Sequence, residues 1–148
     1  MRGVFSWWFR PFLKSIKNLR DYYNTPIGGI YDDIKGFKKP ENVPHRFFGK
    51  LYLLMNYYTG STALGFATVF KDYNLGQIIG QEPSSEVNEF GELYPFDLPN
   101  SHLWVWCSTK RYIRPSGELT VGGLKPDIFV EDKKDSIFNY TINMIKKE

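Results

Sequence analysis

Ser61 is the residue of this chain whose type and position could do chemistry. It follows an apolar run of strand length, residues 50–56, and opens a segment with helical spacing, residues 61–73. A serine at the first turn of a helix can cap that helix by accepting a hydrogen bond from a free backbone N–H, which is its commoner use. It can also be a nucleophile, because the same N–H groups and the helix dipole stabilise an oxyanion that forms beside it.

The other reactive side chains do not form a metal site. His45 and His102 are far apart and lack the spacing of helical ligands, so zinc binding is not expected. Cys107 is the single cysteine, which excludes an internal disulfide and a cysteine-based metal cluster. Its strand-like surroundings predict a small buried apolar residue. We expect neither a metal nor another cofactor.

Composition places the chain among folded proteins of one domain. It has 148 residues, 42% of them hydrophobic, and a formal net charge of only +3. Basic residues are mixed with acidic ones and form only short doublets, so nucleic acid is not an expected partner. No apolar stretch is long enough to cross a bilayer. The aromatic, arginine-containing start does not have the pattern of a signal peptide.

The hydrophobic pattern predicts an α/β fold. A strand over 50–56, buried on both faces, a helix over 61–73 and a strand over 77–80 have the length of a βαβ unit, with Gly65 allowing the helix to approach the sheet closely. A hairpin (92–98 and 102–110), a short strand (127–130) and a helix (132–147) follow. Before them we expect a helix from about Pro11 to about Tyr23, then a loop with one helical turn near 31–35.

Several short segments, in this order, resemble the C-terminal half of the tail-specific (C-terminal processing) serine protease family. They are the strand and serine of Leu51–Ser61, Phe70-Lys-Asp-Tyr-Asn74, Ile78-Ile-Gly80, Leu98-Pro-Asn-Ser101, Lys110-Arg-Tyr-Ile-Arg-Pro115 and Gly123-Leu-Lys-Pro-Asp127. The last looks like the family's Gly-x-x-Pro-Asp signature. Each segment is weak alone, and their joint order carries the resemblance.

The resemblance implies a crotonase-like core with Ser61 as the nucleophile and the Thr62 N–H in the oxyanion hole. A common branch of the family pairs the serine with a lysine, whose position falls on or near Glu86. No lysine occurs between Asp72 and Thr109. A glutamate of ordinary pKa is too weak a base to replace it. The chain therefore resembles the branch that lacks the lysine and takes a histidine from an earlier part of the protein.

That earlier part is not found in this sequence. Asn18-Leu-Arg20 and Gly28-Gly29 resemble its elements only superficially. We therefore expect residues 1–46 to be a variable helix and loop region, and residues 47–148 to be the C-terminal half of a serine-peptidase-like domain. His102 is expected in an exposed turn and His45 in a loop, so neither is the expected base.

We interpret Asp127 and the two tryptophans Trp104 and Trp106 as structural residues and not as parts of a functional site. Asp127 is expected to fix the turn before the last strand by accepting backbone hydrogen bonds. Trp104 and Trp106 lie two apart on a strand and are expected in the core or on a packing surface.

Two functions follow. The first is a serine-type peptidase domain acting on a peptide or protein substrate, with its general base supplied by a missing upstream part. The alternative is an inactive truncated remnant that serves as a protein-interaction module, through self-association or pairing with a missing N-terminal half. The resemblance also implies action outside the cytoplasm, as is usual for family members, although the location of this chain is left open.

Overall fold

A computed structural model describes residues 21, 24–26, 28–34 and 39–147. The chain divides into two compact units, Met1–Lys38 and Lys39–Glu148. Most of the helix predicted for 11–23 lies outside the described residues. Residues 31–34 are described and are not helical, so the predicted helical turn is wrong there. The elements below all belong to the second unit.

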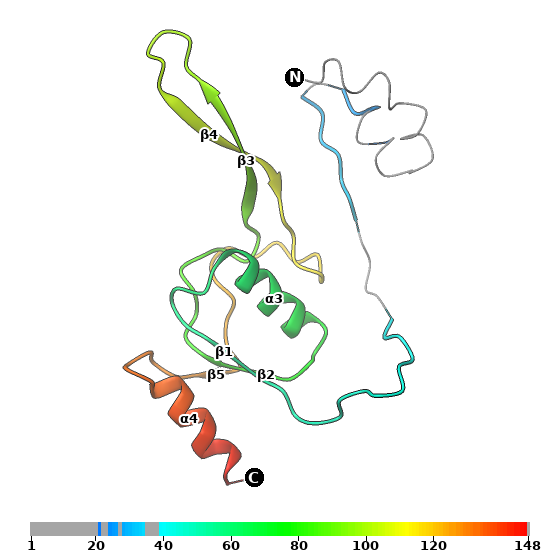
Figure 1. Cartoon of the computed structure of the whole chain (residues 1–148), viewed down its shortest axis with the longest axis vertical. Helices are drawn as coiled ribbons and strands as arrows, with labels where there is room; N and C mark the ends of the chain where they lie inside the picture. The colour runs from blue at the N-terminus through cyan, green and yellow to red at the C-terminus, as the bar shows by residue number, and fades with distance from the viewer. Residues whose placement is uncertain (1–20, 22–23, 27, 35–38, 148) are drawn as a thin grey trace. The chain divides into compact units, whose positions relative to one another are not determined.

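A parallel sheet with one crossing helix forms the centre of this unit. Strand β1 (Tyr52–Met55) is followed by helix α3 (Ser61–Asp72) and strand β2 (Gln77–Gly80). Strand β5 (Ile128–Phe129) completes the sheet in the order β1-β2-β5, with both strand pairs parallel. Figure 1 shows α3 on one side of this sheet and helix α4 (Ser136–Ile145) on the other. The predicted α/β class and βαβ unit are confirmed.

Burial follows from the strand order. The central strand β2 is covered on both faces, and Ile78 and Ile79 are fully buried. Leu64 and Phe70 of α3 pack with Ile78 in the core cluster. Burying each such side chain contributes about 1.5–3 kcal/mol. Strand β1 lies at the edge, where Leu54 is 38% exposed, so the expectation that it is buried on both faces is wrong.

Two glycines of the βαβ unit differ in whether a side chain would fit at their positions. Gly80 has φ 138°, and a Cβ there would lie 1.9 Å from the Met55 carbonyl oxygen, so only glycine fits between the strands. Gly65 is exposed, and a Cβ there would meet no atom within 4 Å. The prediction that Gly65 allows a close approach of the helix is therefore wrong.

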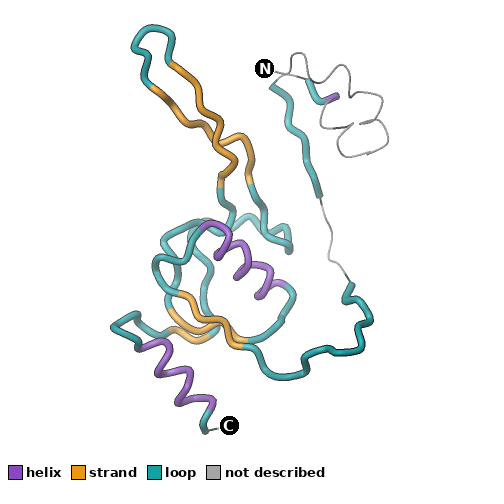
Figure 2. Tube along the Cα trace, viewed as in Figure 1, coloured by secondary structure: helices purple, strands orange, loops and turns teal. Residues whose placement is uncertain are grey.

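The predicted hairpin is confirmed and extends away from the parallel sheet (Figures 1 and 2). It consists of β3 (Phe90–Asp97) and β4 (Trp104–Arg111), closed by a hydrogen bond of 3.0 Å from the Leu98 N–H to the Leu103 carbonyl. Trp104 and Trp106 are exposed, so they belong to a surface and not to the core. Cys107 is also exposed, and its predicted burial is wrong.

Helix α4 begins later than the charge pattern predicts. Lys134 and Asp135 have φ values of 21° and 61°, outside the helical region, so the helix starts at Ser136 and not at 132. Ile137 and Thr141 are its buried residues. Within the described part of the chain, no helix is both long and apolar enough to cross a membrane.

Candidate active site at the start of helix α3

The turn between β1 and α3 is built by short polar side chains. The Asn56 N–H donates to the Thr59 hydroxyl at 3.0 Å, and the Tyr58 N–H donates to the Asn56 side-chain oxygen at 3.1 Å. The Thr59 N–H closes the turn on the Asn56 carbonyl at 3.0 Å. Asparagine favours such local bonds to its own backbone. The turn therefore ends β1 and leads directly into α3.

Ser61 lies at the corner itself and does not cap the helix. The N-cap residue is Gly60, whose carbonyl accepts the N–H groups of Ala63 and Leu64 at 3.2 and 3.4 Å. Ser61 is exposed and has φ 51°, in the left-handed backbone region that residues other than glycine rarely adopt. Its hydroxyl has no hydrogen-bond partner within the described residues. The structure thus removes the capping interpretation of this serine.

The free backbone donor next to Ser61 is the N–H of Thr62. As expected for the first turn of a helix, it has no acceptor in the part of the chain that the structure describes. Thr62 is exposed, so an oxygen atom can approach this N–H from solvent. A hydroxyl beside an open N–H at the positive end of a helix can support attack on a carbonyl carbon.

The loop after β2 lies against this corner. The Ser84 N–H and hydroxyl both donate to the Tyr57 carbonyl, at 3.0 and 3.2 Å. A Cβ built on Gly60 would lie 2.8 Å from the Ser85 hydroxyl oxygen, so this side chain packs on the residue before Ser61. Glu86, at the position where a lysine was sought, is exposed.

No base accompanies the serine in the described residues. His45 is exposed in the loop before β1, and His102 is exposed with φ 56° in the turn of the hairpin, as predicted for both. Across residues 39–147 no hydrogen bond links Ser61 to a histidine or lysine nitrogen. The same residues contain no group of three potential metal ligands.

Asp127 fixes the chain before β5, as predicted. Its carboxylate accepts the Ile78 N–H at 2.8 Å, and its own N–H donates to the Ile78 carbonyl at 2.8 Å. The ammonium of Lys71 lies 3.1 Å from the other carboxylate oxygen. One aspartate therefore joins β5, β2 and the last turn of α3.

A buried ion pair at the other end of α3 was not predicted from the sequence. The Arg114 guanidinium donates through Nε to Asp72 at 3.1 Å and also through Nη2, and the two side chains are only 9% and 4% exposed. The Ser116 N–H adds a bond of 2.9 Å. Burial by itself would raise the pKa of Asp72, but the hydrogen bonds from Arg114 and Ser116 and the charge of Arg114 lower it.

Asn88 also fixes the loop after β4, the loop that carries Arg114. It is 1% exposed, and its amide donates to the carbonyls of Glu118 and Thr120 at 3.1 and 3.3 Å. Its side-chain oxygen accepts the Arg114 N–H at 3.3 Å. The sequence signal for this role was weak: a polar residue, Asn88, beside the apolar Val87 in an otherwise polar loop.

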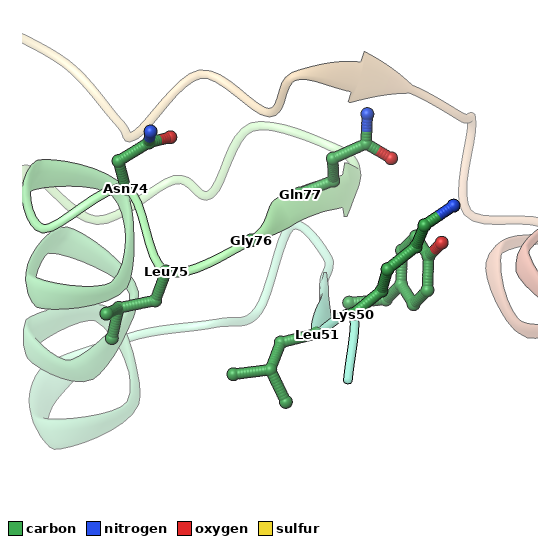
Figure 3. A pocket seen from close by; sticks show the side chains of 7 residues that line it. Lys50, Leu51, Asn74, Leu75, Gly76 and Gln77 are labelled. Atoms are coloured by element: carbon green, nitrogen blue, oxygen red, sulfur yellow. The ribbon is translucent and has the colours of Figure 1, made fainter. Parts of the chain in front are cut away.

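Two pockets of the second unit lie away from Ser61. The larger, of about 310 Å³, is open and sits where β1 and β2 begin (Figure 3). It is lined by Lys50, Leu51, Tyr52, Asn74, Leu75, Gly76 and Gln77. The smaller, of about 250 Å³, lies between the end of β1 and the start of α4 and does not include Ser61. Ser61 lines neither of these two pockets.

Comparisons with known proteins give one family. The family described as "Peptidase family S41" matches residues 13–130, well over half of the chain. A solved structure described as "Crystal Structure of mature CPAF" is 22% identical, with a TM-score of 0.47, over 65% of this chain and 19% of that one. The chain thus spans about a fifth of that protein's length. No curated protein matches the chain.

Proposed function

The chain belongs to peptidase family S41, and from that membership we propose that it carries the nucleophile of a serine-type peptidase, Ser61. The observation that carries the proposal is the φ of 51° at Ser61. Backbone strain of this kind costs roughly 1–3 kcal/mol and persists where the surrounding structure enforces it, often at functional sites. Nucleophilic serines at sharp strand-to-helix turns in other hydrolases are presented in the same manner.

In this proposal Ser61 attacks the carbonyl carbon of a peptide bond while a base accepts its hydroxyl proton. The carbonyl oxygen becomes negative, and the Thr62 N–H donates a hydrogen bond to it. The amine then leaves with a proton, and water hydrolyses the acyl-serine. The base comes from a part of the protein outside residues 47–148, which form the C-terminal half of a crotonase-like domain. Residues 1–46 are a variable region in the same scheme.

The test is covalent labelling with a fluorophosphonate, which reacts with activated serines, of the chain assembled with the upstream part that supplies the base. Labelling should be lost in Ser61→Ala. Thr62→Pro removes the N–H, which has no acceptor in the described chain, and we expect labelling to fall on the order of a hundredfold. Thr62→Ala keeps the N–H and should label at the wild-type rate. Labelling that persists in Ser61→Ala would show that another residue reacts.

The second candidate function is an inactive remnant that binds another protein. The observation in its favour is the lack of a base beside Ser61 among residues 39–147. On this hypothesis the chain does not label at any pH, and it forms a complex with itself or with an N-terminal half supplied separately. A chain that labels through Ser61 and stays a monomer would exclude this candidate.

A further inference from the structure

Ser85, in the loop between β2 and β3, has a hydroxyl group without a partner. Neither this hydroxyl nor the Ser85 N–H forms a hydrogen bond within the described residues. The residue is partly buried, and in the described part of the chain no buried side-chain oxygen or nitrogen lacks a partner. The Ser85 hydroxyl oxygen therefore reaches solvent, and a ligand can contact it.

This hydroxyl lies against the residue that precedes Ser61. A Cβ built on Gly60 would come within 2.8 Å of the Ser85 Oγ, closer than real Cβ atoms approach a neighbour. Allowing for one Cα–Cβ bond and for the spacing of consecutive Cα atoms, the Ser85 Oγ lies within about 8 Å of the Ser61 Cα. An acyl group attached to the Ser61 hydroxyl can therefore reach the Ser85 hydroxyl.

Gly60 provides space and is not required by its backbone conformation. Its φ of −151° and ψ of 176° are extended values that any residue can adopt. A side chain there would meet the Ser85 Oγ first, since the next nearest atoms would lie at ordinary contact distances of 3.7 and 3.9 Å. The glycine therefore leaves room for one group at the start of α3, the Ser85 hydroxyl.

The loop that carries Ser85 is anchored on both sides of this residue. The Ser84 N–H and hydroxyl donate to the Tyr57 carbonyl at 3.0 and 3.2 Å. Val87 is buried, and its N–H donates to the Gly122 carbonyl at 3.1 Å. A hydroxyl on an anchored loop loses little freedom when it binds a ligand, so it can act as a preorganised donor.

We propose that Ser85 is a further catalytic residue, whose hydroxyl donates a hydrogen bond to the carbonyl oxygen of the peptide bond that Ser61 attacks. The inference rests on the proposed function of Ser61. As the Ser61 oxygen bonds to the carbonyl carbon, the π electrons of the carbonyl move to its oxygen, which becomes negative. The Thr62 N–H is one donor to that oxygen and the Ser85 hydroxyl is the second. Ser85 keeps its proton throughout.

Ser85 is the one of three consecutive polar residues that suits this role. The Ser84 hydroxyl already donates to the Tyr57 carbonyl. An ionised carboxylate such as that of Glu86 only accepts hydrogen bonds and would repel a negative oxygen. A serine hydroxyl carries one donor hydrogen, and its bond strengthens when the acceptor becomes charged. The Ser85 hydroxyl therefore favours the transition state over the bound substrate.

The first measurement is the rate of fluorophosphonate labelling of the chain assembled with the upstream part that supplies the base. Ser85→Ala removes the donor, and we expect the maximal labelling rate to fall on the order of a hundredfold. The probe concentration that gives half of this rate should not change, because the lost bond forms mainly as charge develops. Ser85→Thr keeps the hydroxyl and should label faster than Ser85→Ala. The control Ser101→Ala alters an exposed serine in the hairpin turn and should label at the wild-type rate.

The second measurement moves the hydroxyl without deleting it. Gly60→Ala adds a methyl group at the place of closest approach, from which the Ser85 side chain can rotate away to another rotamer. Labelling should slow in this variant. In a chain that already carries Ser85→Ala, the change Gly60→Ala should have no further effect on labelling. Because Ser85 makes no hydrogen bond within the described residues, Ser85→Ala should leave the midpoint of urea denaturation unchanged.

The outcomes separate this role of Ser85 from the proposed function. A wild-type assembly that does not label would remove both. A wild type that labels through Ser61, with Ser85→Ala equally fast, would overturn the role of Ser85 alone. Additive effects of Gly60→Ala and Ser85→Ala, or a lower urea midpoint for Ser85→Ala, would also overturn it, because they would assign Ser85 to the support of the fold.

Discussion

Arg114 donates two hydrogen bonds to the carboxylate of Asp72, and this buried pair joins the loop after β4 to the last residue of the helix that Ser61 begins. The hydrogen bond also raises the pKa of Arg114, which therefore stays charged. The loop, with the Asn88 contacts, is thereby held against the βαβ unit.

Breaking this pair should destabilise the second unit. Asp72→Ala leaves the buried Arg114 charge with only the exposed Glu118 carboxylate beside it, and we expect a loss of about 3 kcal/mol in the free energy of unfolding. Urea denaturation measures it. The control is Lys133→Ala, which breaks a pair with Glu131 whose side chains are 75% and 60% exposed. That change should cost less than about 1 kcal/mol. Equal losses in the two variants would contradict the role given to the buried pair.

Stability should fall in acid because of Asp72. Its folded-state pKa is lowered, so between that value and the unfolded value of about 3.9 the unfolded chain binds more protons. The contribution of Asp72 is therefore present above about pH 4 and is lost as the pH falls through the lowered pKa. Denaturation between about pH 6 and pH 2 should show a steeper decline for the wild type than for Asp72→Asn. Parallel curves would rule out this contribution.

At position 61, the protein with glycine should be more stable than the protein with alanine. Relief of the left-handed conformation should make Ser61→Gly about 1 kcal/mol more stable than Ser61→Ala. Thermal unfolding of both variants tests this. Ser136, the first residue of α4, is the matched control, because its φ is not positive. There the glycine variant should be the less stable one.

Two glycine-to-alanine changes should have opposite signs. A Cβ on Gly123, in the Gly-Leu-Lys-Pro-Asp segment, would lie 2.2 Å from the Pro83 carbonyl oxygen, so Gly123→Ala must displace backbone. We expect a loss of about 2 kcal/mol or more. Gly65→Ala meets open space on a helix and should stabilise by about 0.5–1 kcal/mol. Chemical denaturation measures both, and a stable Gly123→Ala variant would show that the loop after β2 is not packed there.

The family match confirms the recognition of a C-terminal-processing protease-like domain from ordered short segments. The roles of Ser61 and Thr62 stay predictions. Helix α3 and strand β2 were predicted almost to the residue, because helical spacing, a short apolar run and glycine stops are local signals. The start of α4 was predicted too early, because charge pattern does not report the positive φ of Lys134 and Asp135.

The sequence by itself determined the order of the elements and the presence of a serine between a strand and a helix, since both depend on neighbours along the chain. Only the tertiary structure decided that Gly60 and not Ser61 caps the helix, that Asp72 meets Arg114, and that the tryptophans of β4 lie in solvent. These depend on contacts between residues distant in sequence and on dihedral angles that packing enforces. Local patterns do not encode either of them.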